Sequence, residues 1–296
     1  MTSLPDTLCF LDGDYLPLNQ AKVSVMDRGF LFGDGAYESI PVYGRRMFRF
    51  DDHLARLERS LGKLGIEIEL EREAWLGRLR KVIAAHPADD QLVYVQVTRG
   101  VALRSHVVPV GLEPTVFVTT DERSSPTPTQ RAQGLSCVTA RDFRWQRGDI
   151  KSTSLLGNVL ARKISVDQRA DETILLRDDG PGGPWLTEGA SSNVWIVQEG
   201  ALLGPPPDEH LLEGIRFELL RELCEETAIA FNLRPISETD VRAADEVLLS
   251  SASKEIIAVT RLDGDEVGHG ALRGRPGPVY ARLHEAYQRA TRSQSI

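Results

Sequence analysis

The sequence predicts an α+β fold built as two domains, and three observations lead to that prediction. The chain has 296 residues, which is room for two domains of ordinary size. Residues 124–130 are rich in serine, threonine and proline, a composition typical of an exposed connector. Strand-like and helix-like segments follow one another without the regular alternation of a parallel α/β sheet. We therefore expect a small domain over residues 1–123, a linker over 124–130 and a larger domain over 131–296.

The N-terminal domain is expected to begin as a meander of short strands. Residues 7–11 and 37–43 are apolar, strand-like runs, and turns containing glycine follow them. Leucines then recur at helical spacing from Asp51 to Gly65, so we expect an amphipathic helix with an aspartate cap at its start. A second helix over residues 71–85 and a strand over 92–98 complete this domain.

The C-terminal domain mixes both kinds of element. Strands are expected at residues 193–197 and 246–250, where apolar residues dominate. Helices are expected near residues 158–170, 214–227 and 278–291. This order is an α+β pattern rather than a regular βαβ alternation.

Composition and charge exclude several classes of function. The net charge of -8 provides no general attraction for nucleic acid or for an anionic membrane surface, so we expect neither as a partner. The three cysteines lie far apart, and no histidine pair has zinc-ligand spacing, so neither a disulfide nor a metal site is expected. No apolar run has membrane-spanning length and the N-terminus does not resemble a signal peptide, so a cytoplasmic location is expected.

The most informative residues are Lys151, in the segment Asp-Ile-Lys-Ser, and Glu188, in the later segment Thr-Glu-Gly. A lysine shielded from water can present a neutral amine that attacks a carbonyl carbon. A carboxylate held by nearby donors stays ionised and can keep a pyridine nitrogen protonated. Chemistry on pyridoxal phosphate needs such a pair of groups, so Lys151 and Glu188 are candidates for it.

The sequence segments around these two residues resemble those of a known family. Residues 149–161 and 187–194 are similar to the two signature segments of the fold-type IV pyridoxal-phosphate enzymes, and residues 27–38, 53–57 and 213–215 stand in that family's order. The family contains D-amino-acid aminotransferases, branched-chain aminotransferases, R-selective amine transaminases and aminodeoxychorismate lyases. The resemblance implies a small N-terminal α/β domain, a larger C-terminal mixed α/β barrel-like domain, and pyridoxal 5'-phosphate as cofactor.

The resemblance also implies roles for individual residues. Lys151 would form the Schiff base with the cofactor and would move the proton at the substrate Cα. Glu188 would face the pyridine nitrogen. Ser191 and Ser192 would contact the cofactor, whereas Ala190 stands where the family commonly has serine and is left out of the site.

Further residues match the family's phosphate and ring contacts. Arg56 matches the phosphate-binding arginine, whose planar guanidinium suits phosphate oxygens. A helix that opens near Ile215 could add backbone N–H groups. Arg216 and Ala252 stand where many relatives have threonine, so a hydroxyl contact is expected to be lost at each. The expected cofactor-binding residues are Lys151, Glu188, Arg56, Ser191, Ser192, Leu212, Ile215, Arg216, Ser251 and Ala252.

The substrate carboxylate is expected to bind to the loop that follows the strand over 92–98. Arg104 and His106 form an Arg-x-His arrangement that resembles the carboxylate trap of D-amino-acid aminotransferases, completed by a tyrosine matching Tyr37. Arginine binds a carboxylate through a forked pair of hydrogen bonds, and the other two side chains add directional donors. Because the family takes this loop from the neighbouring subunit, we expect a homodimer with shared active sites. Arg99, directly after the strand, is expected to have a scaffold role.

These residues predict a D-amino-acid transaminase that works in two half-reactions. A D-amino acid such as D-alanine would leave its amino group on the cofactor, and a 2-oxo acid such as 2-oxoglutarate would collect it. The alternatives are an aminodeoxychorismate lyase, a branched-chain L-amino-acid aminotransferase and an R-selective amine transaminase. A catalytically silent cofactor-binding protein is the alternative from another class.

Overall fold

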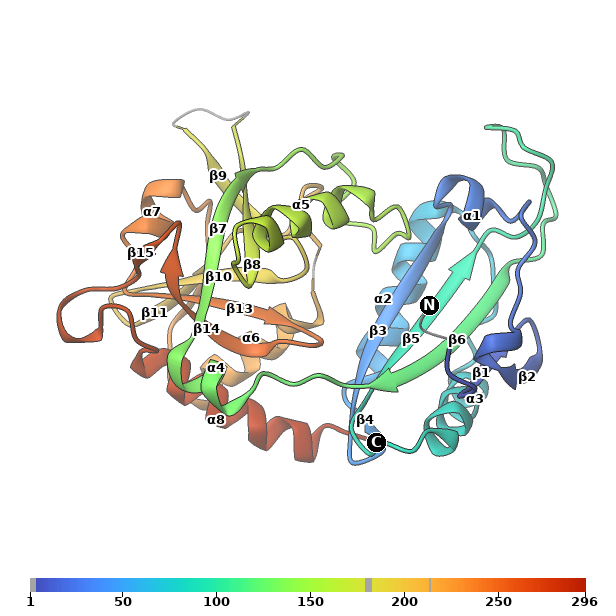
Figure 1. Ribbon diagram of the computed structural model, residues 1–296, viewed down its shortest axis with the longest axis horizontal. Helices are drawn as coiled ribbons and strands as arrows, with labels where there is room; N and C mark the ends of the chain where they lie inside the picture. Colours follow the sequence, from blue (N-terminus) through green and yellow to red (C-terminus); the bar gives the residue numbers. More distant parts are fainter. Residues whose placement is uncertain (1–3, 179–182, 213) are drawn as a thin grey trace. The chain divides into compact units, whose positions relative to one another are not determined.

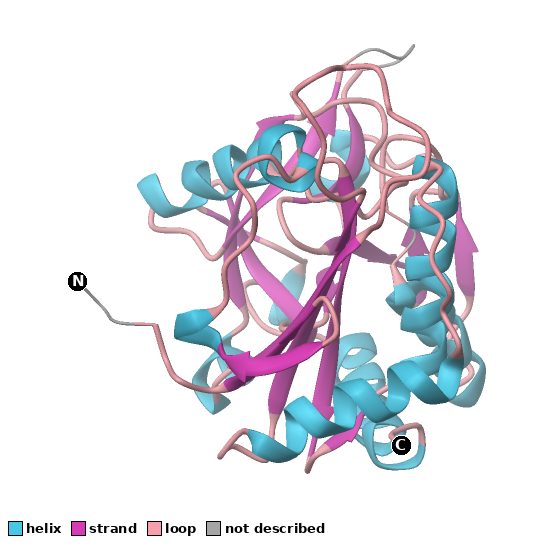
Figure 2. Cartoon of the chain, turned by 90° about the vertical axis from the view of Figure 1, so that its right-hand side faces the viewer, coloured by secondary structure: helices cyan, strands magenta, loops and turns pink. Residues whose placement is uncertain are grey.

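A computed structural model describes residues 4–178, 183–212 and 214–296, and the chain divides into two compact units. The first unit holds the chain up to Arg123 together with Ile150–Leu155 and Thr291–Ile296, and the second holds Ser124–Asp149 and Leu156–Ala290. Helices and strands are interspersed along the whole chain (Figure 2), which confirms the α+β class. Among the described residues, no helix is both long enough and apolar enough to cross a membrane.

The first unit is built on a six-stranded sheet in the order β2-β1-β6-β5-β3-β4. Every neighbouring pair in it is antiparallel. Its elements are β1 (Leu8–Leu11), β2 (Asp14–Pro17), a 3-10 turn (Leu18–Gln20), α1 (Arg28–Phe32), β3 (Gly35–Tyr43), β4 (Arg46–Met47), α2 (Phe50–Leu64), α3 (Arg72–Ala85), β5 (Gln91–Thr98) and β6 (Thr115–Glu122). In Figure 1, α2 lies beside β3. The expected strands and helices of this region are confirmed to within a few residues.

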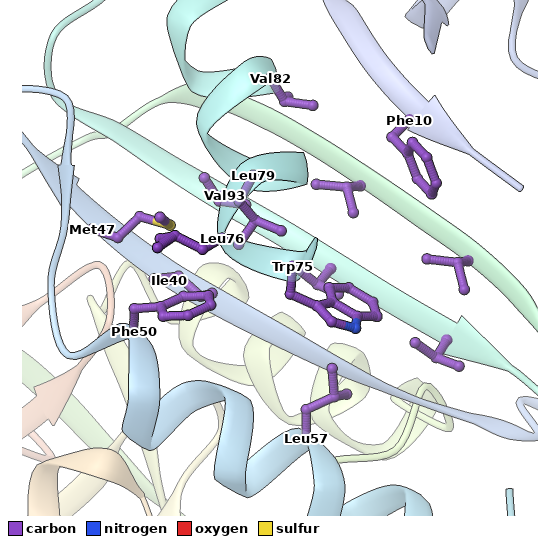
Figure 3. Packing of buried hydrophobic residues seen from close by; sticks show 14 of the residues in the cluster. Phe10, Ile40, Met47, Phe50, Leu57, Trp75, Leu76, Leu79, Val82 and Val93 are labelled. Carbon is purple, nitrogen blue, oxygen red and sulfur yellow. The ribbon is translucent and has the colours of Figure 1, made fainter. Parts of the chain in front are cut away.

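The core of this unit lies between the sheet and the helices α2 and α3. Leu57 comes from α2, and Trp75 and Leu79 from α3; all three are buried against strand residues such as Val93 (Figure 3). Side chains of a strand alternate between its two faces. In β3 the residues at even positions therefore point toward α2, and those at odd positions point away from it.

One expectation about α2 is wrong. The residue before its first turn is Arg49, which has a left-handed backbone with φ of 53°, and no side chain caps the helix there. The two acidic residues that follow lie inside the first turn: Asp51 accepts from Arg72, and Asp52 accepts from Arg49. The aspartates bind arginines instead of free backbone N–H groups, although a negative charge in a first turn is still favourable to the helix dipole. Gly65 ends the helix in a left-handed conformation, as expected.

The second unit is built on a nine-stranded sheet with the order β12-β11-β10-β13-β14-β7-β8-β9, in which β15 also pairs with β14. The sheet is mixed: β7 is parallel to β8 and β14, whereas β10, β13 and β14 are antiparallel. Its elements are α4 (Pro128–Gln133), β7 (Leu135–Arg141), α5 (Leu156–Asp167), β8 (Glu172–Arg177), β9 (Trp185–Gly189), β10 (Asn193–Gln198), β11 (Ala201–Gly204), α6 (Ile215–Glu226), β12 (Phe231–Leu233), α7 (Glu238–Arg242), β13 (Glu246–Ser251), β14 (Glu255–Leu262), β15 (Asp265–Glu266), a 3-10 turn (Gly270–Leu272) and α8 (Pro278–Ser293).

This sheet curls on itself. Strand β9 lies at one edge of the sheet, yet the chain passes from β9 to β10 through a turn of only three residues. A hydrogen bond from the N–H of Gly189 to the carbonyl of Ser192, at 2.6 Å, closes this turn. The chain can join an edge strand to a strand far across the sheet in so few residues only if the sheet bends round. A buried apolar core that includes Ile174, Val194 and Leu249 fills the inside. The expected barrel-like C-terminal fold is confirmed.

Two short segments of the expected larger domain pack with the first unit. The first segment is Ile150–Leu155, in which Ser152 forms a β-bridge with Ala36 of β3. The second segment is Thr291–Ile296, in which Ser295 forms a β-bridge with Phe48. The expected linker over residues 124–130 also contains the start of α4, capped by the Thr127 hydroxyl. Sequence composition does not report such pairings, because they depend on backbone hydrogen bonds between residues far apart in the chain. In the matched segment 213–215, Glu213 lies outside the described residues.

Candidate active site

Lys151 lies on the segment that pairs with β3. Its carbonyl accepts from the N–H of Tyr37 at 3.0 Å, and the next residue but one, Thr153, donates its hydroxyl to the Gly33 carbonyl at 2.9 Å. These bonds fix the backbone on both sides of the lysine. The amine of Lys151 lies 4.2 Å from the centre of the Tyr37 ring, so the two residues expected to act on the substrate are neighbours.

Arg56 is held by a buried carboxylate on the other face of β3. Its Nε and Nη2 donate to Glu38 at 2.6 and 2.8 Å, and His53 Nδ1 lies 2.7 Å from the same carboxylate. Burial alone would raise the pKa of Glu38, but the charge and hydrogen bonds of Arg56 and His53 lower it well below its usual value. Glu38 is therefore an anion that fixes the orientation of Arg56, while Nη1 of the arginine takes no part in those bonds.

Arg104 and His106 lie on the loop between β5 and β6, and both are exposed. Both side chains pack against Phe32, whereas Tyr37 stacks on Tyr94 with ring centres 5.6 Å apart. The first unit thus brings together the arginine and the histidine of the expected carboxylate trap. Arg99, which precedes this loop, binds Asp34 and two carbonyls at the end of α2, which agrees with the expected scaffold role.

Glu188, in the second unit, lies near the end of β9 and is buried. One of its oxygens accepts from Arg144 Nη1, and the other accepts from the backbone N–H of Leu212 at 3.3 Å. Arg144 also forms a fork with Asp142, whose second partner is the Thr187 hydroxyl. Burial by itself would lower the pKa of Arg144, but its bonds to Asp142 and its attraction to Glu188 raise it. The guanidinium therefore stays charged and keeps a cation beside Glu188.

The turn after β9 carries both expected serines. Ser191 Oγ donates to Glu172 at 2.7 Å, and Ser192 Oγ donates to the same carboxylate at 3.2 Å. Lys254 completes this group, since its amine lies 2.6 Å from Glu172 and 2.9 Å from the Ser191 hydroxyl. The hydroxyls of this turn are thus fixed by a buried ion pair.

The start of α6 lies next to the turn after β13. The Nε of Arg216 donates to the Ser251 carbonyl at 3.3 Å, and the Ser251 hydroxyl accepts from the N–H of Lys254 at 3.0 Å. Gly214 caps the helix, and a side chain there would collide with the Asn193 amide. The structure thus brings together the residues expected around the phosphate: Ile215, Arg216, Ser251 and Ala252.

Each unit by itself holds groups whose chemistry suits a part of pyridoxal phosphate. The second unit offers a buried carboxylate at Glu188 for a protonated ring nitrogen. It also offers the N-terminus of a twelve-residue helix, α6, whose free N–H groups suit a phosphate. The first unit offers the amine of Lys151 for the aldehyde, and Arg56 for the phosphate.

Sequence reasoning missed the residues that hold the others in place. Glu38, Arg144, Glu172 and Lys254 each bind an expected site residue through a charged hydrogen bond. The signal for Arg144 was its spacing two residues after Asp142, which permits a fork but occurs in many loops. The partners of Lys254 are distant in the sequence, so no local pattern could have indicated them.

The chain is similar to proteins of one known family. The family model for amino-transferase class IV matches residues 35–262. A D-alanine aminotransferase of Staphylococcus aureus (strain MSSA476) is 35% identical over 97% of this chain and 99% of its own length. One from Bacillus licheniformis is 34% identical over 96% and 97%.

Solved structures have the same fold. A branched-chain amino acid aminotransferase from Escherichia coli superposes with a TM-score of 0.84 at 24% identity, over 96% of this chain and 93% of that one. A second branched-chain amino acid aminotransferase, solved with pyridoxamine 5'-phosphate, superposes with a TM-score of 0.88 at 22% identity, over 98% and 96%. The chain therefore belongs to the amino-transferase class IV family, whose transaminases use pyridoxal phosphate.

Proposed function

We propose that the protein is a D-amino-acid transaminase, which moves the amino group of a D-amino acid such as D-alanine to a 2-oxo acid such as 2-oxoglutarate. The observation that carries the proposal is that Arg104 and His106, which lie on one exposed loop, both contact the ring of Phe32. A forked cation and a second polar group placed together in this way can receive a carboxylate. Relatives named D-alanine aminotransferase, at 33–35% identity over nearly the whole chain, support it.

Each residue has a definite task in this proposal. Pyridoxal phosphate, when bound, withdraws electrons from the substrate Cα and so makes its C–H bond acidic. The amine of Lys151 would take the proton from that carbon and deliver it to C4′, the former aldehyde carbon of the cofactor. Glu188, which accepts a hydrogen bond from Arg144, would face the ring nitrogen and accept its proton's hydrogen bond. The side on which the carboxylate binds decides which enantiomer presents its Cα–H to the lysine.

The cofactor contacts are proposed for the residues that the second unit gathers and for Arg56. Arg56 is fixed by Glu38, so its free edge has one orientation in which to meet the phosphate. Backbone N–H groups at Ile215 and Arg216 and near Ser251 and Ala252 supply further donors. Leu212 packs beside the ring while its N–H holds Glu188. Ser191 and Ser192 complete the contacts through the turn that Glu172 orders.

A homodimer with shared active sites is part of the proposal. The loop that carries Arg104 exposes several apolar side chains: Leu103 is 85% exposed, Val107 77% and Val110 fully exposed. Apolar side chains grouped on one loop are typical of a surface that another chain covers. Sedimentation of the purified protein should therefore give twice the mass of the chain. The substrates are small molecules, and a cytoplasmic location stays a prediction that cell fractionation would check.

The test is the absorption spectrum of the purified protein before and after D-alanine or L-alanine is added in separate samples. We expect a band near about 410–420 nm from the lysine-bound cofactor, lost with D-alanine alone. Loss with L-branched-chain amino acids instead would overturn the proposed stereochemistry. Release of product without any amino acceptor would identify a lyase.

Arg104→Ala provides the matching test of the carboxylate site. The KM for D-alanine should rise at least about tenfold, since a charged hydrogen-bonded contact contributes about 1.5–3 kcal/mol. The melting temperature should not change, because the side chain is exposed. Unchanged turnover of D-alanine by a folded Arg104→Ala protein would show that the carboxylate binds elsewhere.

A further inference from the structure

Phe32, at the end of α1, is the meeting point of three polar side chains. We propose that its ring is a positioning device for the substrate carboxylate, which holds Arg104 and His106 in the orientation that receives the substrate. This inference rests on the proposed function, because it gives a purpose to a contact of the carboxylate loop. It assigns a role to an uncharged residue that was not among the expected site residues.

The geometry around the ring supports the proposal. The guanidinium carbon of Arg104 lies 5.5 Å from the ring centre of Phe32, and that of Arg28 lies 4.8 Å from it. The ring of His106 lies 5.6 Å away at an angle of 46°. All of these distances are within the range of cation–π and aromatic contacts, which favour a particular placement of the partner.

Both trap residues are exposed in the single chain, and both contact the Phe32 ring. An arginine side chain on a surface loop has many rotamers, and a substrate that binds it must bear the entropic cost of fixing one of them. A ring below the guanidinium reduces the number of rotamers before the substrate arrives, without using any of its N–H donors. Within the part of the chain that the structure describes, no hydrogen bond takes up an N–H of Arg104, so these donors stay available for a carboxylate.

The second arginine fixes the loop backbone at the same place. Arg28 donates from Nη1 to the carbonyl of Ser105, between the two trap residues, at 2.7 Å. Its Nε donates to Asp34 at 2.8 Å. Burial would raise the pKa of Asp34, but its bonds to Arg99 and Arg28 lower it, so the carboxylate stays charged and keeps Arg28 in place. The Phe32 ring is thus in contact both with the buried Arg28, which is held by Asp34, and with the exposed Arg104.

The short helix that carries the ring is held at both ends. The Asp27 carboxylate caps the short helix α1 by accepting from Gly29, and Gly33 ends it in a left-handed conformation. The Gly33 carbonyl accepts from the hydroxyls of Thr153 at 2.9 Å and Ser154 at 3.1 Å. These two residues follow Lys151 closely, so the ring is anchored to the segment that carries the catalytic amine.

The experiment compares Phe32→Leu with Phe32→Tyr in the full-length, cofactor-loaded enzyme. Leucine is apolar and packs in a similar space but has no π face, whereas tyrosine keeps the ring. For Phe32→Leu we expect the KM for D-alanine to rise about three- to fivefold with kcat within about twofold of the parent. The inhibition constant of propionate, which binds through its carboxylate alone, should rise by the same factor. Phe32→Tyr should restore both values.

Each other outcome has a definite meaning. If Phe32→Leu lowers kcat while KM and the propionate constant stay unchanged, the ring does not position the carboxylate site and the inference fails. If both variants match the parent in every constant, it also fails, and the D-alanine activity of the parent still supports the proposed function. A parent enzyme that turns over no D-amino acid would overturn the proposed function itself. Circular dichroism and melting curves confirm that both variants are folded.

Discussion

Replacing Lys254 by methionine should destabilise the second unit more than any exposed lysine replacement. The Glu172 carboxylate is 0% exposed and lies 2.6 Å from the Lys254 amine, which is itself only 19% exposed. Methionine has a similar length and removes the positive charge. The carboxylate then stays buried without its cation, which is the costly way to break a buried ion pair.

The magnitude follows from the remaining partners of Glu172. Removing one member of a buried pair costs about 3–5 kcal/mol. The carboxylate keeps hydrogen bonds from the hydroxyls of Ser191 and Ser192 and from the N–H of Thr173, which offset part of this loss. We therefore expect the free energy of unfolding of the second unit to fall by about 2–3 kcal/mol at neutral pH.

The stability difference between Lys254→Met and the parent should depend on pH. Burial would raise the pKa of Glu172, but Lys254 and the Ser191 hydroxyl lower it below its usual value. The pair therefore stabilises the folded protein above the pKa of the unfolded carboxylate, about 4.3, and this stability is lost as the pH falls below that value. Without the lysine, Glu172 can take up a proton in mild acid. The difference between Lys254→Met and the parent should accordingly shrink between about pH 7.5 and about pH 4.5.

The assay is urea denaturation followed by circular dichroism, with cofactor at equal concentration in every sample. Lys163→Met is the matched control, because Lys163 also lies 2.6 Å from a carboxylate, Asp167, but is 65% exposed. That control should change the free energy of unfolding by less than about 0.5 kcal/mol. Adding Glu172→Gln to Lys254→Met should recover at least about 1 kcal/mol. A Lys254→Met protein as stable as the parent, or one whose deficit is independent of pH, would refute the argument.

Three further replacements test the charged groups of the site. Lys151→Ala should lose the band near about 410–420 nm and all measurable turnover, with an unchanged melting temperature; a retained band would exclude Lys151 as the cofactor's lysine. Arg56→Met should lower the free energy of unfolding by about 3–5 kcal/mol, because Glu38 is left buried, and adding Glu38→Gln should recover part of the loss; no change on urea denaturation would contradict this. Arg144→Lys keeps the charge but cannot form the fork with Asp142, so the dissociation constant of pyridoxal phosphate, measured by equilibrium dialysis, should rise about fivefold; equal binding would show that the fork is dispensable.

Elements with a strong local pattern were predictable from the sequence. The helix that ends at Gly65 and the strand over 92–98 follow from their apolar periodicity, and both were found within a residue or two. The cap at the start of that helix was not predictable, because Asp51 and Asp52 could cap it by type but bind arginines instead. The competition between a backbone N–H and a guanidinium for one carboxylate is decided by distant residues.

The candidate site shows the same division. Lys151 and Glu188 could be named as candidates because the sequence segments around them match a family. The groups that hold such residues could not be named. Glu38, Arg144 and Lys254 act through partners up to 82 positions away, and a buried charge is tolerated only where such a partner meets it.

By itself the sequence determined the α+β class, the family and the cofactor, and it named Lys151 and Glu188 as candidates for the reacting groups. These depend on residue types and short spacings, which are present in the unfolded chain as well as in the folded one. Only the tertiary structure decided which short segments leave their domain, which carboxylate fixes each arginine, and that Phe32 supports both trap residues. Such contacts join residues far apart in the chain, and their energies depend on burial and direction, which have no local signature in the sequence.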